Sequence, residues 1–498
     1  MKHNTPNVIS LLLAAALLAS CGASDAPVSS DTTASASADT PVSATGSDPT
    51  NSDEINRENA QMLLPELDFG GTVVDVLYVG DNIIYRQDVY AEETGDVVDD
   101  AVYARNIAIE ELLNIDFNPV TYENDTAGTA NHINVTVMAG EDLYDLCSSH
   151  QSYTTKLIMK GFFHNFADDE YINWDMPWWN LDYMREMAVG DDKIFFLMGD
   201  ISLMRMKSLG AVYYNRELYD DLYGDPDEPY DLVFDGKWTL DKFSELVRGG
   251  YADLNGNSQR DVGDRYGAVA NYSKSVEHFH FASGVTTTTK DENGIPTLTL
   301  NNERTINFVE KFYKLYYENE GFYLDEDASI YDHIDEFMGG QYLFCPVWFR
   351  EAEQLREMTT DYGIVNYPKF AEDEEYKTLV HNGTTVFVTP VTSKLTDKIG
   401  AVCEAMAFYN YKSVTPAYYE IALKVKYSRD DKTAQILDLI SDSASTNFGY
   451  VFSSTLNYLG TLRDLMKQKT TDFSSWYAKK ESTGQAGLQK LIDTYLEQ

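Results

Sequence analysis

GTVVDVLYV (residues 71–79) has the apolar, β-branched pattern of a buried strand, and it decides the class of fold. DAVYARNIAIEELLNIDF (100–117) follows it, with apolar residues at helical spacing and then a second strand-like run. YDLCSS (144–149) is a further candidate for a buried strand. Because strands and helices alternate along this part of the chain, the sequence predicts an α/β domain around a parallel sheet.

The end of the third strand is a candidate wall of a binding site. In parallel α/β sheets, ligands bind beyond the carboxyl ends of the strands. The loop Ser148-Ser149-His150-Gln151 falls at such an end. The alternative is an ordinary polar turn with no role in binding.

Length and charge narrow the kinds of partner. A chain of 498 residues with 43% hydrophobic residues is long enough and apolar enough to bury two cores. Its 80 acidic and 38 basic residues give a formal net charge of -42, which repels phosphate backbones and anionic lipid headgroups. We therefore expect no nucleic-acid partner and favour an uncharged small molecule as ligand.

The first twenty residues have the zones of a secretion signal. Lys2 and His3 precede an apolar run that is too short to span a bilayer. The run ends in Leu-Ala-Ser-Cys (18–21), which resembles the lipobox of bacterial lipoproteins, so Cys21 is predicted to carry the lipid anchor. The alternative is an ordinary cleaved signal with an incidental cysteine. Residues 21–63 are mainly small and polar after the cysteine, which predicts a flexible tether.

The remaining cysteines do not suggest a disulfide framework. Cys147, Cys345 and Cys403 are odd in number and have apolar neighbours, so we expect buried free thiols. No Cys and His cluster has zinc spacing.

DLNGNSQRDVGD (253–264) has the ligand order of an EF-hand calcium loop. It follows a predicted helix in which Thr239 is the N-cap, Leu240, Phe243, Leu246 and Val247 form the apolar face, and Trp238 packs beneath. Two departures weaken the match, because Ser258 replaces the usual glycine and Asp264 replaces the usual glutamate. The predicted role is structural, and the alternative is a solvated turn. The predicted ligands are Asp253, Asn255, Asn257, the carbonyl of Gln259, Asp261 and Asp264.

Several segments together resemble one protein family. They are the lipobox and tether, GDISLMRMKSLGAVYYNRELYDDL (199–222), GKWTLDKFSELV (236–247) and the calcium-like loop with the residues that follow it. The tail PAYYEIALKVKYSRDDKTAQILDLISDS (416–443) is similar to C-terminal segments of large members from Gram-positive bacteria. In this order, over nearly the whole chain, the segments resemble the family 1 extracellular solute-binding proteins of bacterial ABC importers.

The resemblance implies a type II periplasmic-binding-protein fold, with two α/β lobes joined by a hinge that the chain crosses more than once. It implies lobe 1 from residues 64–200 and about 385–430, and lobe 2 from about 201–384 and 431–498. The implied ligand is a sugar or oligosaccharide. The implied partners are the transmembrane subunits of an ABC permease, with a monomeric receptor held by its lipid on the outer face of the cell membrane, more typical of a Gram-positive cell.

The resemblance also nominates site residues. FMGGQYLFCPVWFRE (337–351) resembles the family segment in which a strand ends at a ligand-facing aromatic residue. We expect aromatic faces and planar polar groups because sugars present C–H faces and hydroxyls. The nominated residues are Trp348, Arg350, Asp200, Ser149, His150, Gln151, His381 and Asn382, with Trp178 and Trp179 as a platform at the rim.

Each nomination has a plainer alternative. Trp178 and Trp179 could be core residues, Arg350 could pair with Glu351 or Glu353 at the surface, and His381 could be a satisfied buried histidine, which we favour for that residue.

The predicted mechanism is a clamp and not a catalyst: the solute binds one lobe, the hinge closes, and the closed form docks on the permease. Two rival classes stay open. A lipid-anchored glycan hydrolase needs a pair of carboxylates across a cleft, which 80 acidic residues do not exclude. A glycan-binding protein without transport would need no hinge. The sequence contains no G-x-S-x-G, H-E-x-x-H or phosphate-binding glycine loop.

Overall fold

β1 (Thr72–Tyr78) lies inside a four-stranded sheet of order β12-β3-β1-β2. It pairs in parallel with β2 (Ile115–Thr121) and with β3 (Leu146–His150), as the alternation predicted. The fourth strand, β12 (Thr385–Val388), runs antiparallel to β3 and comes from more than 230 residues later in the chain. The expectation of an all-parallel sheet is therefore wrong at this one edge.

The computed structural model describes residues 55–80, 83–122, 125–190, 193–326, 332–424 and 431–497, so the predicted signal segment, Cys21 and most of the predicted tether lie outside the described residues. Within the described ranges, no helix combines the length and the apolar character that a membrane span requires. Cys147, Cys345 and Cys403 are buried free thiols, which confirms that prediction.

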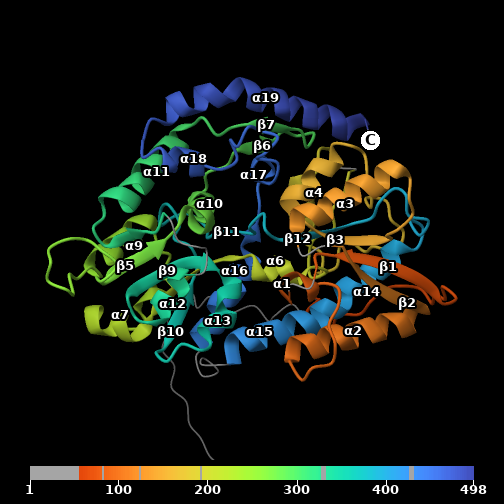
Figure 1. Cartoon of the computed structure of the whole chain (residues 1–498), viewed down its shortest axis with the longest axis horizontal. Coiled ribbons are helices and arrows are strands. Elements are labelled where there is room, and N and C mark those ends of the chain that lie inside the picture. Colours follow the sequence, from red (N-terminus) through yellow and green to blue (C-terminus); the bar gives the residue numbers. More distant parts are fainter. Residues whose placement is uncertain are drawn as a thin grey trace, which may run out of the picture. The chain divides into compact units, whose positions relative to one another are not determined.

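Helices cover the first sheet (Figure 1). α2 (Val97–Leu113) begins where the Asp96 carboxylate accepts hydrogen bonds from the Val98 and Asp99 amides. It packs against β2, α14 (Ile399–Tyr409) and α15 (Thr415–Lys424). α3 (Thr126–Ala139) packs against β3 and α4 (Gln151–Ile158).

A second sheet has the order β10-β4-β9-β5-β8. Every residue of its four longer strands is buried, which is expected for strands covered on both faces. β5 pairs in parallel with β8 and β9, while β4 is antiparallel to β9 and β10. The strands are β4 (Gly210–Asn215), β5 (Tyr266–Ala270), β8 (Phe322–Leu324), β9 (Tyr342–Trp348) and β10 (Tyr362–Val365).

α9 (Leu240–Gly249), beside β5, matches its sequence signals. The Thr239 side chain accepts from the Lys242 amide at 3.2 Å, and the predicted apolar face is buried. Trp238 is fully buried and its indole N–H donates to the Asn366 carbonyl at 2.7 Å. The packing role predicted for Trp238 is confirmed.

The chain passes between the two sheets at three adjacent segments. β11 (Thr378–Leu379) pairs in parallel with β13 (Ala444–Ser445). Leu209, just before β4, bridges to Val380, and the His381 amide donates to the Ser208 carbonyl at 3.0 Å. Short segments joined by few hydrogen bonds are suited to act as a hinge.

The C-terminal segment packs on both parts of the fold. α19 (Phe473–Glu497) packs against β7, and the Tyr495 hydroxyl donates to the Met187 carbonyl at 3.1 Å (Figure 1). The remaining elements are α1 (Ile83–Arg86), α5 (Leu181–Met187), α6 (Leu203–Lys207), α7 (Arg216–Tyr223), α8 (Glu228–Phe234), α10 (Tyr272–Ala282), β6 (Thr288–Lys290), β7 (Pro296–Leu298), α11 (Glu303–Tyr313), η1 (Lys314–Glu318), α12 (Asp332–Met338), η2 (Phe349–Glu351), α13 (Ala352–Leu355), η3 (Asn410–Val414), α16 (Asp431–Asp442), α17 (Phe448–Val451) and α18 (Arg463–Lys467).

Candidate ligand-binding site

A cavity of about 350 Å³ lies where the end of β3 meets the hinge. We call it the cleft cavity. Its first wall is His150 and Ser152, its second is His381, Asn382 and Gly383 of the loop after β11, and its third comes from the C-terminal segment. The C-terminal lining residues are Tyr450, Ser453, Tyr458, Thr461, Arg463, Asp464 and Lys467.

Trp348 connects the second sheet to the wall of the cleft cavity. It is the last residue of β9, and its ring centroid lies 4.6 Å from that of His381. The Arg350 guanidinium stacks over the Trp348 ring, 4.2 Å from its centroid. Trp348 and His381, both nominated from the sequence, are 33 positions apart in the chain and their rings are in contact.

Arg350 forms an ion pair with Glu351, as its plainer alternative predicted, but the pair is buried and not at the surface. Its Nε lies 3.7 Å from Glu351 Oε1, and both side chains are nearly buried, at 10% and 4% exposed. A guanidinium so placed stacks on Trp348 and adds positive charge to the region of His150 and His381.

The two histidines of the cavity are neutral at pH 7. Burial, with a smaller contribution from the nearby Arg350 charge, lowers the pKa of His150 to about 4. Burial lowers the pKa of His381 well below its usual value, and neighbouring His278, Arg463 and Arg350 act in the same direction. A neutral imidazole can donate from one nitrogen and accept at the other, which suits hydroxyl groups.

Aromatic rings surround the His150 side of the cavity. The His150 ring centroid lies 5.2 Å from that of Tyr153 in α4 and 6.4 Å from that of Tyr85 in α1. The Ser152 hydroxyl lies 3.0 Å from His150 Nδ1, in hydrogen-bond contact. Tyr85 and Ser152 were not among the residues nominated from the sequence.

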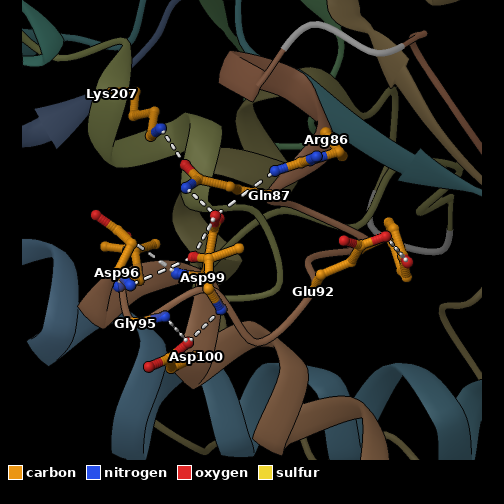
Figure 2. A network of polar contacts seen from close by, with 11 residues as sticks. Arg86, Gln87, Glu92, Gly95, Asp96, Asp99, Asp100 and Lys207 are labelled. Carbon is orange, nitrogen blue, oxygen red and sulfur yellow. Dashed lines mark hydrogen bonds and ion pairs between the residues drawn. The ribbon is translucent and has the colours of Figure 1, made fainter. Parts of the chain in front are cut away.

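A polar network holds the segment that carries Tyr85 (Figure 2). Lys207 Nζ donates to Gln87 Oε1 at 2.7 Å, and Gln87 Nε2 donates to Asp99 Oδ1 at 2.8 Å. Arg86 lies 3.6 Å from the other Asp99 oxygen. Lys207 ends α6 just before the hinge, so the network joins α1, the start of α2 and the hinge.

The hinge loop is fixed by hydrogen bonds to both sides. Gln151 Nε2 donates to Asn382 Oδ1 at 2.6 Å, and Asn382 Nδ2 donates to the Tyr450 carbonyl at 3.0 Å. The Gly383 amide donates to His381 Nδ1 at 2.9 Å. A side chain at Gly383 would start 2.9 Å from that same nitrogen, so the turn has room only for glycine.

Ser149 and Gln151 are behind the cavity wall and not in it. Both are fully buried. Ser149 Oγ accepts from Thr154 Oγ1 at 2.8 Å, and Gln151 Oε1 accepts from the Tyr183 hydroxyl at 2.8 Å. These bonds position β3 and the hinge loop, so the nomination of Ser149 and Gln151 as ligand contacts is corrected to a supporting role.

The rim platform nominated for Trp178 and Trp179 is wrong. Trp178 is 0% and Trp179 6% exposed, and both indole N–H groups donate to Glu404, at 3.2 and 2.7 Å. Their core alternative is the correct one. Burial raises the pKa of Glu404 to about 7, against the lowering effect of the two indole hydrogen bonds.

Asp200 is also away from the cleft cavity. It is 6% exposed, its Oδ1 accepts from Thr415 Oγ1 at 2.5 Å, and its backbone amide donates to the Trp178 carbonyl. It lines a different cavity, together with Trp178 and Trp179. Residues 177–179 and 199–200 meet there, so three nominated residues line this second cavity and not the cleft cavity.

The C-terminal wall was missed from the sequence. Arg463 is paired with the fully buried Glu277 at 2.8 Å, and the pair places α18 against α10. Lys467 Nζ lies over the Tyr272 ring at 5.7 Å. The Tyr, Arg and Lys residues at 450–467 are types common in binding sites, so they could have been nominated. Residue order gave no indication that they lie beside β3, some 300 positions earlier.

The side chains of the calcium-like loop bond mainly to the loop's own amides. The Asp253 carboxylate accepts from the amides of Gly256 and Ser258, at 2.7 and 2.8 Å. Ser258 has φ +58°, the left-handed conformation that favours glycine at this position of an EF-hand. Asn255 and Asn257 both donate to the Asp261 carboxylate, at 2.9 and 2.6 Å.

The other predicted metal ligands complete the loop. Asp264 is 1% exposed and accepts from the Leu254 and Asp261 amides, and the Gln259 amide donates to Asn257 Oδ1. Oxygen-bearing side chains therefore gather around Asp261, a donor set that suits calcium if the two asparagine amides turn their oxygens inward. Among the described residues, no group of three or more His, Cys, Asp or Glu side chains is placed to hold a metal ion.

Solved structures of solute-binding proteins share this architecture. A cyclo/maltodextrin-binding protein complexed with maltotetraose aligns with a TM-score of 0.52 and 12% identity over 86% of this chain and 97% of its own. The chain has the solute-binding protein fold. An ABC transporter solute-binding protein from Thermotoga lettingae bound with alpha-D-tagatose gives a TM-score of 0.52 and 10% identity, over 85% and 100% of the two chains.

A third structure with the solute-binding protein fold binds a solute that is not a plain sugar. UgpB from Mycobacterium tuberculosis, in complex with glycerophosphocholine, aligns with a TM-score of 0.52 and 14% identity over 85% of this chain and 99% of its own. No protein-family model and no curated protein sequence matches the chain. The solute-binding protein fold confirms the predicted two α/β lobes joined by a hinge with several crossings.

Proposed function

We propose that the protein is an extracellular receptor of an ABC importer that binds a sugar or oligosaccharide in the cleft cavity. The observation that carries the proposal is the convergence of Trp348, His150 and His381 at the hinge, from the ends of two sheets and the loop between them. Aromatic faces beside neutral imidazoles and amides suit the C–H faces and hydroxyls of a sugar. Two structures with this fold hold maltotetraose and tagatose, which supports the same class of ligand.

In this proposal the direct ligand contacts are Trp348, Arg350, His150, His381 and Asn382. Solute binding draws the two lobes together about the β11 and β13 segments, and the closed form docks on the transmembrane subunits of the permease. The lobe assignment is residues 64–200 with about 385–430, and about 201–384 with 431–498. The receptor acts as a monomer.

The proposal places the receptor on the outer face of the membrane of a Gram-positive cell. Cys21 carries a lipid after removal of residues 1–20, and residues 21–63 tether the folded part. A tether keeps the receptor at high effective concentration near its permease.

The rival classes differ in what they do to the ligand. A glycan hydrolase would convert the bound sugar to products, and a surface glycan-binding protein would bind it without closing. We propose a receptor without enzymatic activity because both sheets end at a hinge of three short segments, which a clamp requires and the rivals do not.

A thermal-shift experiment tests the proposal. Maltotetraose, D-tagatose and glycerophosphocholine are added separately to the purified protein, since structures with this fold hold them. A ligand at 100 times its Kd stabilises the folded state by about 2.7 kcal/mol. We expect at least one sugar to raise Tm and to be recovered unchanged. If no member of a wider carbohydrate panel raises Tm, or if a bound sugar is cleaved, the proposal is wrong.

We also propose that the loop 253–264 binds a structural calcium ion. Asp253, Asn255, Asn257, the Gln259 carbonyl, Asp261 and Asp264 would supply oxygen ligands, and Ser258 already has the backbone conformation of the glycine position. The ion would hold the end of α9 against the start of β5, because the loop joins these two elements.

Removal of calcium is expected to lower the stability of the protein. With EDTA, the free energy of unfolding should fall by about 2–3 kcal/mol relative to saturating calcium, as expected for loss of a tightly bound ion. Calcium, but not magnesium, should restore Tm. The variant Asp261→Ala should show no response to EDTA. An unchanged melting curve of the wild-type protein in EDTA would exclude the site.

A further inference from the structure

A second cavity, of about 490 Å³, shares no lining residue with the cleft cavity. We call it the hinge-side cavity. It is lined by residues of the hinge strand β13 and the preceding turn, by Arg205 of α6, and by lobe 1 residues that include Asp200 and Tyr411. The proposed function leaves this cavity unused.

Arg205 is the unexplained group in the hinge-side cavity. It is only 7% exposed, and its buried Nε has no hydrogen-bond partner. In the described part of the chain, its guanidinium has no carboxylate within 4.0 Å. A buried donor left without an acceptor costs about 1–3 kcal/mol, so such a donor is normally bonded.

Other buried cations near the hinge are paired. Lys207, two positions later, lies 3.2 Å from Glu353 and donates to Gln87. Arg105 is 2% exposed and donates to two backbone carbonyls and to Asn410. Both of these cations have acceptors for their donors, and the contrast indicates that the acceptor for Arg205 comes from a ligand in the cavity.

Asp200 gives the ligand a second point of attachment. Its Oδ1 is bonded to Thr415, while its Oδ2 accepts no hydrogen bond from the described residues. Asp200 and Arg205 line the same cavity without forming an ion pair. A molecule between them needs an oxyanion for the guanidinium and a hydrogen-bond donor for the carboxylate.

The charges at the mouth limit the net charge of that molecule. Arg57 is exposed, with its guanidinium 5.0 Å from the Tyr411 ring centroid and 5.7 Å from that of Tyr419. The two exposed acids Asp182 and Asp442 also line the cavity. Two cations and three carboxylates disfavour a dianion and favour a zwitterion or a monoanion.

We propose that the hinge-side cavity binds a small hydroxy acid or amino acid, with its carboxylate on Arg205 and its hydroxyl or ammonium group on Asp200. The planar guanidinium can donate two parallel hydrogen bonds to a carboxylate. The proposal does not depend on the identity of the ligand in the cleft cavity.

Calorimetric titration of the full chain tests the proposal with three probes. L-lactate carries the carboxylate and a hydroxyl, L-alanine carries the carboxylate and an ammonium group, and acetate carries the carboxylate alone. We expect lactate or alanine to bind, and acetate to bind at least about 10-fold more weakly, because it leaves Asp200 without a donor. Absence of binding by both lactate and alanine at about 10 mM would overturn the proposal, as would acetate binding as tightly as either.

Variants of Arg205 locate the bound probe. Arg205→Met should abolish binding, and its Tm without ligand should equal or exceed that of the wild type, because a buried donor without an acceptor is removed. Arg205→Lys keeps the charge but loses the planar fork, and should weaken binding at least about 10-fold. Arg248→Met, on the exposed side of α9, is the matched control and should bind as the wild type. Wild-type binding by both Arg205 variants would overturn the proposal.

Discussion

Trp348→Ala is expected to weaken sugar binding by roughly 100-fold, about 3 kcal/mol, as is typical when a central aromatic contact is truncated. Trp348 ends β9 and is 8% exposed, and its ring contacts the His381 ring and the Arg350 guanidinium. Its loss removes the aromatic contact proposed for the sugar, and it also frees Arg350 from its position. The measurement is calorimetric titration with the sugar that gives the largest thermal shift.

Two variants separate a binding effect from general damage to the fold. Trp348→Phe keeps an aromatic face and should lose about 10-fold or less in affinity. Trp174→Ala removes a partly buried tryptophan that packs against Trp179, away from the cleft cavity, and should leave affinity unchanged. Wild-type affinity in Trp348→Ala would show that Trp348 does not contact the sugar.

Local sequence signals predicted local structure well. The run at 71–79 forms β1, Thr239 caps α9 through its side chain, and the four apolar residues of α9 are buried together. These features depend on residues within one or two turns of each other, where periodicity and capping act directly. The free, buried state of Cys147, Cys345 and Cys403 followed from their apolar neighbours in the same way.

The order of residues did not predict which distant segments pair. β12 joins β3 antiparallel because the chain returns from the second sheet, and the reversal leaves no signal within either strand. Similarly, α18 lines the cleft cavity because Arg463 pairs with Glu277, 186 positions earlier in the chain. A contact between distant segments is decided by the whole fold and not by the pattern of one segment.

Aromatic residues show why the sequence did not separate candidate ligand contacts from core residues. Trp348 and the Trp178-Trp179 pair are equally suited to stack on a sugar, and the sequence does not distinguish them. Trp178 and Trp179 are core residues because the Glu404 carboxylate accepts a hydrogen bond from each of their buried indole N–H groups. Position at the end of a buried strand was the more useful signal, since it placed both Trp348 and His150 correctly beside the hinge loop.

Arg105→Met is expected to destabilise the protein by about 3–5 kcal/mol, the usual cost of breaking a buried charged network. Arg105 is 2% exposed on α2, and its Nη1 donates to the Asp88 carbonyl and to Asn410 Oδ1, both at 3.0 Å. Its Nη2 donates to the Val89 carbonyl at 2.8 Å. Methionine fills most of the volume but leaves the Asp88 carbonyl and Asn410 Oδ1 without the Arg105 donor. The Val89 carbonyl keeps its hydrogen bond from Asn106 Nδ2 at 2.9 Å.

The effect of this change should extend to the walls of both cavities. The fully buried Asp88 carboxylate accepts from the Ser148 hydroxyl at 3.3 Å and from the Met204 amide at 3.0 Å, so it joins β3 to α6. Asn410 Nδ2 donates to the Asp200 carbonyl at 2.8 Å. Arg105 therefore supports β3, whose last residue is His150, and the segment that carries Asp200, although it lines neither cavity.

Urea denaturation measures the change in the free energy of unfolding, and Arg86→Met is the matched control. The Arg86 side chain is 24% exposed, and its Nη2 lies 3.6 Å from Asp99, so its removal should cost less than about 1 kcal/mol. The two arginines are 19 positions apart on either side of Asp88 and Asp99 (Figure 2 shows the Arg86 side), and they differ mainly in burial and in the number of acceptors served. If both variants lose the same small amount of stability, the prediction is wrong. Asp88, Val89 and Asn410 would then not need a buried guanidinium as hydrogen-bond donor.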